Sequence, residues 1–356
     1  MNNLNFYNGK RIFITGHTGF KGSWLAIMLH KLGAEITGYA LDPITHDDNF
    51  EVCGLDSFVS DVRGDIRDYK HLNQVFKDTA PEIVFHLAAQ PLVITSYEDP
   101  RSTYETNVMG TLNVLESVRN CPSVKAVVVI TTDKCYENKE SLWGYRETDR
   151  LGGYDPYSSS KACAELLASS YRNSFYTNIA TARAGNVIGG GDWAANRIVP
   201  DCIRSFKHGD DIKIRNPLAT RPWQHVIEPL YGYLTLAQHL YEEGVKFAEA
   251  WNFGPDSTGL INVWKLAELL LHELGVGKLV NCSSDDALHE TAFLSLDITK
   301  AGCLLGWKPM FSVEETVKLT ADWYKLYMQK PDADEMFRLC EKQIDYYFGI
   351  RKKVGI

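Results

Sequence analysis

The sequence predicts an α/β fold, with a doubly wound parallel sheet followed by a smaller, mixed C-terminal lobe. Short apolar runs alternate with helical patterns through the first half of the chain, as in successive βαβ units. The runs are continuously apolar, as expected of strands that are covered on both faces. After residue 183 this alternation stops, and a glycine-rich segment and several helical patterns follow.

The elements expected in the first half follow one another in βαβ order. Strands are expected at 11–15, 35–41, 58–62, 83–87, 126–130 and 179–183. Helices are expected at 21–32, 68–78, 103–120 and 156–176, where apolar residues recur with helical spacing.

The second half is expected to begin with an irregular loop at 184–196, which contains four glycines. Helices are then expected at 198–208, 227–241, 262–274, 297–305 and 313–328, with a short strand at 250–253. The run Arg351, Lys352 and Lys353 near the end is interpreted as a solvated tail.

Composition excludes several classes of protein. The 356 residues are 45% hydrophobic and 23% charged, which is a globular mixture and excludes disorder. The net charge of −8 argues against a general nucleic-acid binder, which would present a basic face. An anionic substrate would therefore require a local cluster of arginine and lysine.

Cysteine usage and hydropathy bear on the compartment. The eight cysteines are scattered, with no CxxC pair and no histidine at metal-ligand spacing, so we expect free thiols and no metal site. The N-terminal residues lack the apolar core of a signal peptide, and no apolar run approaches the roughly 20 residues that span a bilayer. We expect a soluble, cytoplasmic protein.

A glycine-rich turn joins the first strand to the first helix. Residues 16–22 read Gly-His-Thr-Gly-Phe-Lys-Gly, a GxxGxxG variant of the dinucleotide fingerprint, in which glycines let the backbone approach a pyrophosphate at the helix N-terminus. Asp42 ends the second strand about 20 residues past the last glycine, where an acidic side chain binds the adenosine ribose. No arginine or lysine lies between residues 38 and 47, so NAD is favoured over NADP. From this turn, the residues expected to bind the cofactor are Gly16, His17, Thr18, Gly19, Phe20 and Gly22.

Two later strand ends fit the same cofactor. Asp65 and Ile66 follow the third strand, where they would hold an adenine edge. The fourth strand ends in small side chains that let a cofactor lie close, in the run Leu87, Ala88, Ala89 and Gln90. Ordinary packing at strand ends is the alternative for both segments.

Tyr157 and Lys161 form a YxxxK pair, which places both side chains on one face of a helix. A nearby ammonium favours the phenolate and so lowers the pKa of the tyrosine. A tyrosinate can take the proton of an alcohol while nicotinamide accepts the hydride. An isolated match would be a plain helix-surface pair, but this one follows five strands of a dinucleotide-binding pattern.

Together these motifs resemble the extended short-chain dehydrogenase/reductase family, in its nucleotide-sugar branch. The resemblance covers nearly the whole chain, including 15–22, 86–90, Asn107, Tyr157, Lys161, 183–187, 221–226 and 296–301. It implies a Rossmann-type NAD-binding domain at 1–185, to which 226–255 returns, and an interleaved substrate-binding lobe at 186–356. It also implies tightly held NAD, a cofactor contact by Asn107 and a nucleoside diphosphate sugar as substrate. Charge and hydropathy, as described above, predict no nucleic-acid or membrane partner. A homodimer or dimer of dimers is expected through the helices at 103–120 and 156–176.

The segment after the fifth strand separates activities within this branch. It reads Thr-Thr-Asp-Lys-Cys-Tyr at 131–136. Epimerases of the branch carry small residues there, whereas the sugar 4,6-dehydratases place an acid and a base after the threonine. Lys134 stands where other dehydratase types have glutamate, and Thr-Asp-Lys, together with residues 16–24, most resembles the CDP-glucose type. A solvated ion pair is the alternative for Asp133 and Lys134.

The resemblance implies a hydro-lyase that converts CDP-D-glucose to CDP-4-keto-6-deoxy-D-glucose, in deoxysugar and O-antigen (lipopolysaccharide) biosynthesis. Thr132 would orient the C4 hydroxyl, Tyr157 would take its proton, and Asp133 would protonate the departing C6 hydroxyl. Lys134 would act either as a neutral base at C5 or as a cation that stabilises the enolate.

Arg197 and Arg221 are expected to bind the diphosphate, and Asn186 resembles a substrate-contacting asparagine of the family. Plain surface arginines are the alternative. Two other functions stay open: a nucleotide-sugar C4 epimerase, which Asp133 disfavours, and a non-catalytic NAD-binding regulatory protein, which Tyr157 disfavours.

Overall fold

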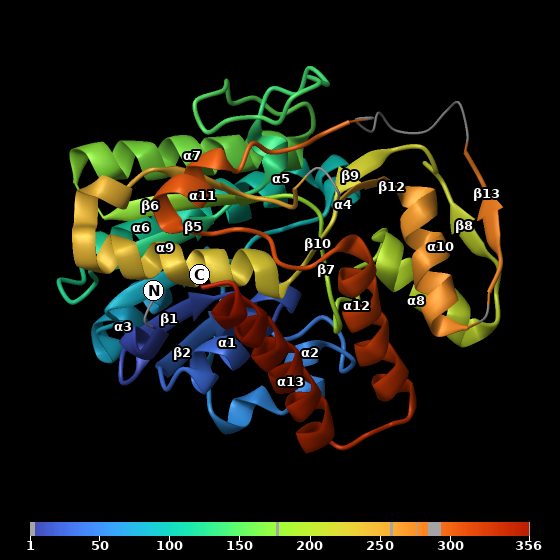
Figure 1. Ribbon diagram of the computed structural model, residues 1–356. Helices are drawn as coiled ribbons and strands as arrows, with labels where there is room; N and C mark the ends of the chain where they lie inside the picture. The colour runs from blue at the N-terminus through green and yellow to red at the C-terminus, as the bar shows by residue number, and fades with distance from the viewer. Residues whose placement is uncertain (1–3, 176–177, 257–258, 276, 284–292, 356) are drawn as a thin grey trace.

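The computed structural model describes residues 4–175, 178–256, 259–275, 277–283 and 293–355. Its centre is a seven-stranded parallel sheet in the order β11-β6-β5-β4-β1-β2-β3 (Figure 1). The strands are β1 Arg11–Thr15, β2 Glu35–Ala40, β3 Ser60–Arg63, β4 Ile83–His86, β5 Ala126–Ile130, β6 Ile179–Ala184 and β11 Ala250–Phe253. The order reverses between β1 and β4, so the predicted doubly wound fold is confirmed.

Helices cover both faces of the sheet. One face carries α3 (Tyr69–Thr79), α6 (Gly110–Arg119) and α7 (Pro156–Ser174), and the other carries α1 (Phe20–Lys31) and α9 (Ile227–Glu243). Successive residues of β1 therefore enter different cores: Ile12 and Ile14 pack on the side of α1, and Phe13 packs on the side of α3. Burial on both faces explains why the strands are continuously apolar in sequence.

Two C-terminal helices, α12 (Val313–Met328) and α13 (Ala333–Lys353), close the side of the molecule next to α1 (Figure 1). The residues predicted to form a solvated tail, 351–353, are the last turn of α13, where Lys352 and Lys353 are exposed but Arg351 is buried, so the prediction was wrong for Arg351. The side chain of Arg351 is only 3% exposed, and its guanidinium lies 4.1 Å from the ring centroid of Tyr231. A planar guanidinium stacks well on an aromatic face, which a run of basic letters does not reveal.

Some predicted boundaries differ from the structure. The helix expected at 103–120 is divided into α5 (Pro100–Tyr104), a π-helical turn (Glu105–Met109) and α6. The short helices α2 (Asn49–Val52) and α4 (Val93–Glu98), and the long α13, were not predicted. β3 begins at Ser60, two residues later than expected, after a 3₁₀ turn at Leu55–Ser57. Residue 176, where we expected α7 to end, lies outside the described residues.

The chain after β6 builds a smaller lobe from short strand pairs and helices. The pairs are β7 (Val187–Ile188) with β10 (Gln224–His225), β9 (Thr220–Pro222) with β12 (Leu260–Asn262), and β8 (Ile212–Ile214) with β13 (Leu279–Asn281). The helices α8 (Ile198–His208) and α10 (Val263–Leu274) complete it, whereas α11 (Thr299–Leu305) packs against β11 and α9 at the edge of the central sheet. The expected loop at 184–196 thus contains one strand, β7. The division of the chain at residue 185 stays a prediction. Within 226–255, α9 packs against the central sheet and β11 is its edge strand next to β6.

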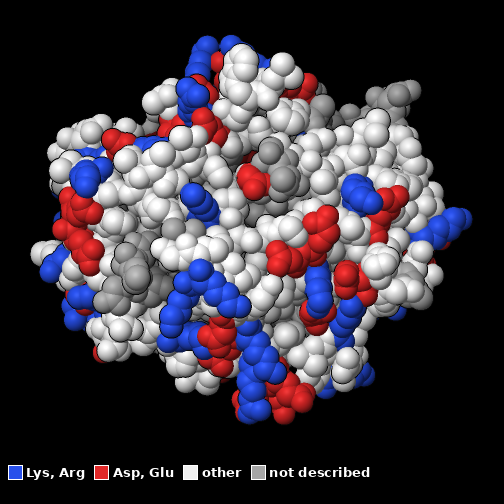
Figure 2. Space-filling view, in the orientation of Figure 1, with Lys and Arg blue, Asp and Glu red and all other residues white. Residues whose placement is uncertain are grey.

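Surface and composition expectations can be compared with the structure. All eight cysteines are free thiols. On the face shown in Figure 2, basic and acidic side chains are interspersed and form no continuous basic surface. Within the described part of the chain, no helix is long and apolar enough to cross a bilayer, and no cluster of metal-ligating side chains is present.

Candidate active site

A cavity of about 880 Å³ lies at the carboxyl ends of the central strands, between the sheet and the smaller lobe. Its wall includes the residues that follow β1 to β6, and residues 213–216, Arg221 and Trp223 from the smaller lobe. The carboxyl edge of a parallel sheet, next to the point where strand order reverses, is where such folds bind ligands. Most of the residues that the sequence motifs singled out lie on this wall.

Glycines shape the turn from β1 into α1. Gly16 has a φ of 76°, and a Cβ there would lie 2.8 Å from the backbone nitrogen of Ala88. A Cβ at Gly22 would lie 2.1 Å from the carbonyl oxygen of Gly16, so only glycine allows this close turn. Gly19 lines the cavity, and because it has no side chain, a ligand can come close to the backbone amides of the first turn of α1. Approachable amides at a helix N-terminus suit an anion, so these residues fit the pyrophosphate of a dinucleotide.

Asp42 lies on the cavity wall at the end of β2, and its side chain is 89% exposed. The carboxylate lies 3.8 Å from the guanidinium of Arg63, at the end of β3. A basic side chain thus reaches the expected ribose site from the neighbouring strand, although residues 38–47 contain none. Asp65 and Ile66 also line the cavity, and hydrogen bonds from Arg67 lower the pKa of Asp65.

Three of the predicted cofactor-binding residues, His17, Gln90 and Asn107, are not on the cavity wall. The buried His17 ring lies 2.9 Å from the carboxylate of Asp61. The backbone N–H of Gln90 donates to the Asn107 side chain at 2.8 Å, and the Asn107 amide donates to the Gln90 carbonyl at 3.0 Å and to Ser160 at 2.9 Å. Asn107 therefore joins the segment after β4 to α7 from behind the cavity wall. It stabilises the wall and does not itself face the predicted cofactor site. The other predicted residues of this group do line the cavity: Thr18, Phe20, Leu87, Ala88 and Ala89.

The YxxxK pair projects into the cavity from the first turns of α7. This helix begins at Pro156, and its N-cap Asp155 accepts a hydrogen bond from the backbone N–H of Ser158. One turn later, the ammonium of Lys161 donates to the carbonyl of Ile130 at 3.1 Å, which fixes α7 to the end of β5. Burial lowers the pKa of Lys161 to about 8.

Tyr157 is buried, and this burial raises its pKa to about 12. A hydrogen bond with Thr132 and the charge of Arg197 oppose the rise without reversing it. The prediction of a lowered pKa was therefore wrong for the protein chain by itself, because desolvation of the phenolate outweighs the cations around it.

Asp133 follows β5 and is only 3% exposed. One carboxylate oxygen accepts a hydrogen bond from Thr132 at 3.0 Å, and the other is buried with no hydrogen-bond partner among the described residues. Burial raises the pKa of Asp133 although the charges of Lys134, Arg221 and Lys21 act against it. This burial excludes the solvated ion pair as an interpretation of Asp133. A carboxyl group that holds its proton more tightly is suited to general acid catalysis.

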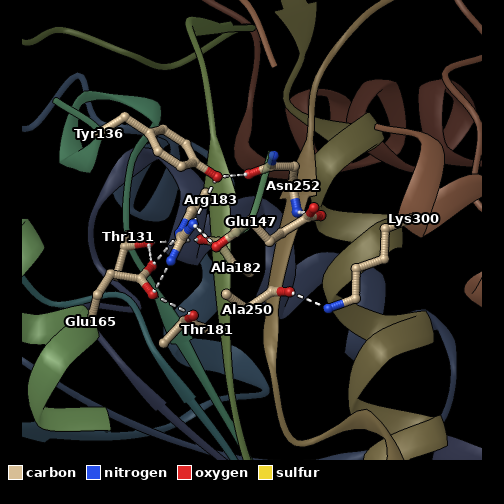
Figure 3. A network of polar contacts seen from close by, with 10 residues as sticks. All are labelled: Thr131, Tyr136, Glu147, Glu165, Thr181, Ala182, Arg183, Ala250, Asn252 and Lys300. Atoms are coloured by element: carbon tan, nitrogen blue, oxygen red, sulfur yellow. Dashed lines mark hydrogen bonds and ion pairs between the residues drawn. The ribbon is translucent and has the colours of Figure 1, made fainter. Parts of the chain in front are cut away.

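A buried polar network lies directly behind this segment (Figure 3). The carboxylate of Glu165, one turn after Lys161, accepts hydrogen bonds from Thr131 and Thr181 and two from Arg183. Arg183 also donates to the hydroxyl of Tyr136 at 2.7 Å. Thr131 and Tyr136 bracket residues 132–135, so the network fixes this segment relative to α7 and β6.

The three residues expected to bind substrate also line the cavity. Arg197, at the N-cap of α8, is 34% exposed and donates to Asp192 at 2.9 Å. Arg221 on β9 is only 8% exposed, so it is not a plain surface arginine. Asn186 lies two residues after the end of β6.

The sequence analysis missed three further cations on the cavity wall, which are Lys21, Lys213 and Arg215. A lysine inside the glycine motif was the signal that could have identified Lys21.

Comparison with known proteins identifies the family of the chain. Residues 13–320 match the family model described as GDP-mannose 4,6 dehydratase. The chain is 49% identical to the CDP-glucose 4,6-dehydratase of Salmonella typhimurium, over 97% of this chain and 98% of that one. It is 30% identical to the dTDP-glucose 4,6-dehydratase of Streptomyces antibioticus, over 88% of this chain and 92% of that one.

Solved structures show the same fold. A dTDP-glucose 4,6-dehydratase from Streptomyces venezuelae, solved with NAD bound, superposes with a TM-score of 0.78 at 23% identity and covers 90% of this chain and 98% of its own. An epimerase from Methanothermobacter thermautotrophicus gives a TM-score of 0.79 at 25% identity, covering 93% of this chain and 96% of its own. The sequence resemblance is therefore confirmed, and the chain belongs to the GDP-mannose 4,6-dehydratase family.

Proposed function

We propose that this protein is a hydro-lyase that dehydrates CDP-D-glucose to CDP-4-keto-6-deoxy-D-glucose, using an NAD that is restored within each turnover. One observation carries the proposal: the buried carboxyl group of Asp133 shares a cavity with the pair Tyr157 and Lys161. An epimerase needs the pair but no acid for a leaving hydroxyl. The relative from Salmonella typhimurium, similar over almost its whole length, supports CDP-glucose as the substrate.

The bound NAD would accept a hydride from C4 of the glucose and return it to C6. Thr132 orients the C4 hydroxyl, and Tyr157 takes its proton as the phenolate, a form that the positive charge of the bound cofactor's nicotinamide ring would favour together with that of Arg197. The resulting ketone acidifies the C5 hydrogen, and Lys134 either accepts that proton or stabilises the negative charge of the enolate. Asp133 donates its proton to the C6 hydroxyl, which leaves as water. With the hydride that the cofactor would return to C6, addition of a proton at C5 would complete the 6-deoxy product.

Isotopic labelling tests the proposal. CDP-glucose carrying deuterium at C4 should yield a keto sugar with deuterium at C6, measured by NMR, with no label in added free cofactor. Label in the free cofactor would instead indicate an ordinary dehydrogenase. The keto sugar also gives an ultraviolet chromophore in alkali, and its absence together with formation of the C4 epimer would assign an epimerase. Absence of both products would favour the third hypothesis, a non-catalytic regulatory protein that binds NAD.

We also infer a cofactor-binding lobe at 1–185 with 226–255, a substrate lobe at 186–356, a cytoplasmic location, and a role in supplying deoxysugars for lipopolysaccharide. A dimer, or a dimer of dimers, through the helices at 103–120 and 156–176 is supported by exposed apolar side chains on them, including Met109 (51%) and Leu166 (61%). Light scattering of the wild-type protein and of Leu166→Glu tests the assembly, since a charge in such an interface should release monomers.

A further inference from the structure

Lys21 is a cation of the cavity that no step above uses. It stands in the first turn of α1, between Phe20 and Gly22, and lines the cavity. Across the described residues, no hydrogen bond or ion pair to its ammonium is present. The two cations whose charges act on Lys21 each have a partner of their own. Arg197 forms an ion pair with Asp192, and Lys161 donates a hydrogen bond to a backbone carbonyl.

The surroundings of Lys21 leave its positive charge poorly compensated. Burial lowers its pKa to about 8, and the charges of Arg197 and Lys161 add to this effect. Asp133 and Asp192 act in the opposite direction and do not restore the ordinary value. The N-terminal end of α1 contributes further positive potential. A partly desolvated ammonium without a partner costs free energy, which an anionic ligand would recover.

We propose that the ammonium of Lys21 binds a phosphate oxygen of a ligand in this cavity. The inference rests on the proposed function, which brings two diphosphates to the site, that of the dinucleotide and that of the nucleotide sugar. Lys21 belongs to the turn that fits the dinucleotide pyrophosphate and lies within electrostatic reach of Arg197, which is expected to bind the sugar nucleotide. Its charge would supplement the backbone amides of that turn.

Calorimetric titrations with NAD, ADP-ribose and CDP test the inference, with CDP added to protein saturated with NAD. Lys21→Met should bind the affected ligand about 10- to 100-fold more weakly, the usual effect of losing a hydrogen bond to a charged group. Equal losses for NAD and ADP-ribose would assign the dinucleotide phosphates, and a loss for CDP would assign the substrate diphosphate. Lys21→Arg should recover part of the affinity.

Lys31→Met is the matched control, because Lys31 ends the same helix and pairs with Glu341 and Asp345 instead. It should bind all three ligands as the wild type does. Thermal unfolding shows which variants are folded, and Lys21→Gln provides a second neutral side chain if the methionine disturbs the turn.

The pH dependence of binding gives an independent measurement. Below pH 8 Lys21 carries its proton, so the affinity of the wild type should fall as the pH rises through about 8. Lys161 has a similar pKa and is unchanged in Lys21→Arg. The difference in the pH dependence of affinity between this variant and the wild type therefore reports the titration of Lys21 alone. The other charged groups that act on Lys21 are Arg197, Asp133 and Asp192. The affinity of Lys21→Arg should fall less steeply with rising pH than that of the wild type, because arginine keeps its charge.

Unchanged affinity of the neutral variants for all three probes would overturn the inference. A loss for NAD without a loss for ADP-ribose would also overturn it, because the contact would then be to the nicotinamide end. A wild-type protein that binds NAD and CDP but forms no keto sugar would refute the proposed function and leave the role of Lys21 standing.

Discussion

Arg183 and Glu165 form a paired contact in the interior, with each side chain only 3% exposed and two N–H···O bonds of 3.0 and 2.8 Å between them (Figure 3). Burial alone would raise the pKa of Glu165, but Arg183 and two threonine hydroxyls lower it below the ordinary value. The carboxylate is therefore charged at neutral pH and fully hydrogen-bonded. This contact joins β6 to α7 immediately behind the segment that carries Asp133.

Glu165→Gln should destabilise the protein, because it leaves the guanidinium of Arg183 buried without a counter-charge. Breaking a buried pair in this way costs about 3–5 kcal/mol of unfolding free energy. Urea unfolding measures the loss. Glu105→Gln removes the partner of Arg101 in an exposed pair and should change stability by less than about 1 kcal/mol. Equal, small losses in both variants would show that Arg183 is compensated by other groups.

Asp133→Asn should slow water loss while cofactor binding and oxidation at C4 continue. The change keeps the shape of the side chain and removes the titrating proton of the carboxyl group, whose pKa burial raises. General acid catalysis contributes about 10²–10⁴-fold, and the rate of keto-sugar formation should fall by such a factor. Reduced cofactor should accumulate in the enzyme, measured by its absorbance. Dehydration at a near-normal rate would remove Asp133 from the acid role.

Two substitutions at Lys134 distinguish a base from an electrostatic stabiliser. As the base at C5, Lys134 can be replaced in part by a carboxylate, so Lys134→Glu should retain more activity than Lys134→Met. The methionine variant should lose exchange of the C5 hydrogen with solvent, measured by NMR, while C4 oxidation continues. The reverse order of activities would assign charge stabilisation, since glutamate would repel the enolate. Full activity in both would make Lys134 a bystander.

Asp42→Ala should shift the cofactor preference from NAD toward NADP. The aspartate contributes an acceptor for the ribose, whereas Arg63, 3.8 Å away, would be left to face a 2′-phosphate. We expect about 10-fold weaker NAD binding from loss of a charged hydrogen bond. Fluorescence titration with both cofactors measures the ratio. The exposed Asp56→Ala is the control, and an unchanged ratio in Asp42→Ala would place the ribose elsewhere.

The sequence predicted the sheet well because burial on both faces leaves a strong local signal. α8 and α12 were predicted with the bounds that the structure has, and β1, β5 and β11 likewise. α13 was missed because charged residues alternate with its buried side chains, such as Met336, Cys340 and Ile344. The short strand pairs of the smaller lobe depend on partners distant in sequence, which no local pattern contains.

In the candidate site too, features that depend on local sequence were predicted, and features that depend on contacts distant in sequence were not. Motif residues such as Gly16, Tyr157 and Asp133 were placed on the cavity wall from the sequence, because their spacing is local to one strand end or one helix turn. The engagement of Asn107 with Gln90, and the approach of Arg63 to Asp42, depend on contacts between separate strands and helices. Desolvation of Tyr157 likewise depends on the completed cavity, so the direction of its pKa shift was not readable from the YxxxK spacing.

The packing of α13 against α1 has a consequence for synthesis of the chain on the ribosome. α1 is buried from Gly22 to Leu29, yet α13, which helps to cover it, is synthesised long after α1. The first βαβ unit therefore has an apolar helix surface uncovered until α13 has emerged from the ribosome. Nascent chains that stop before residue 333 should be held by chaperones or aggregate, whereas chains that extend past residue 353 should be released.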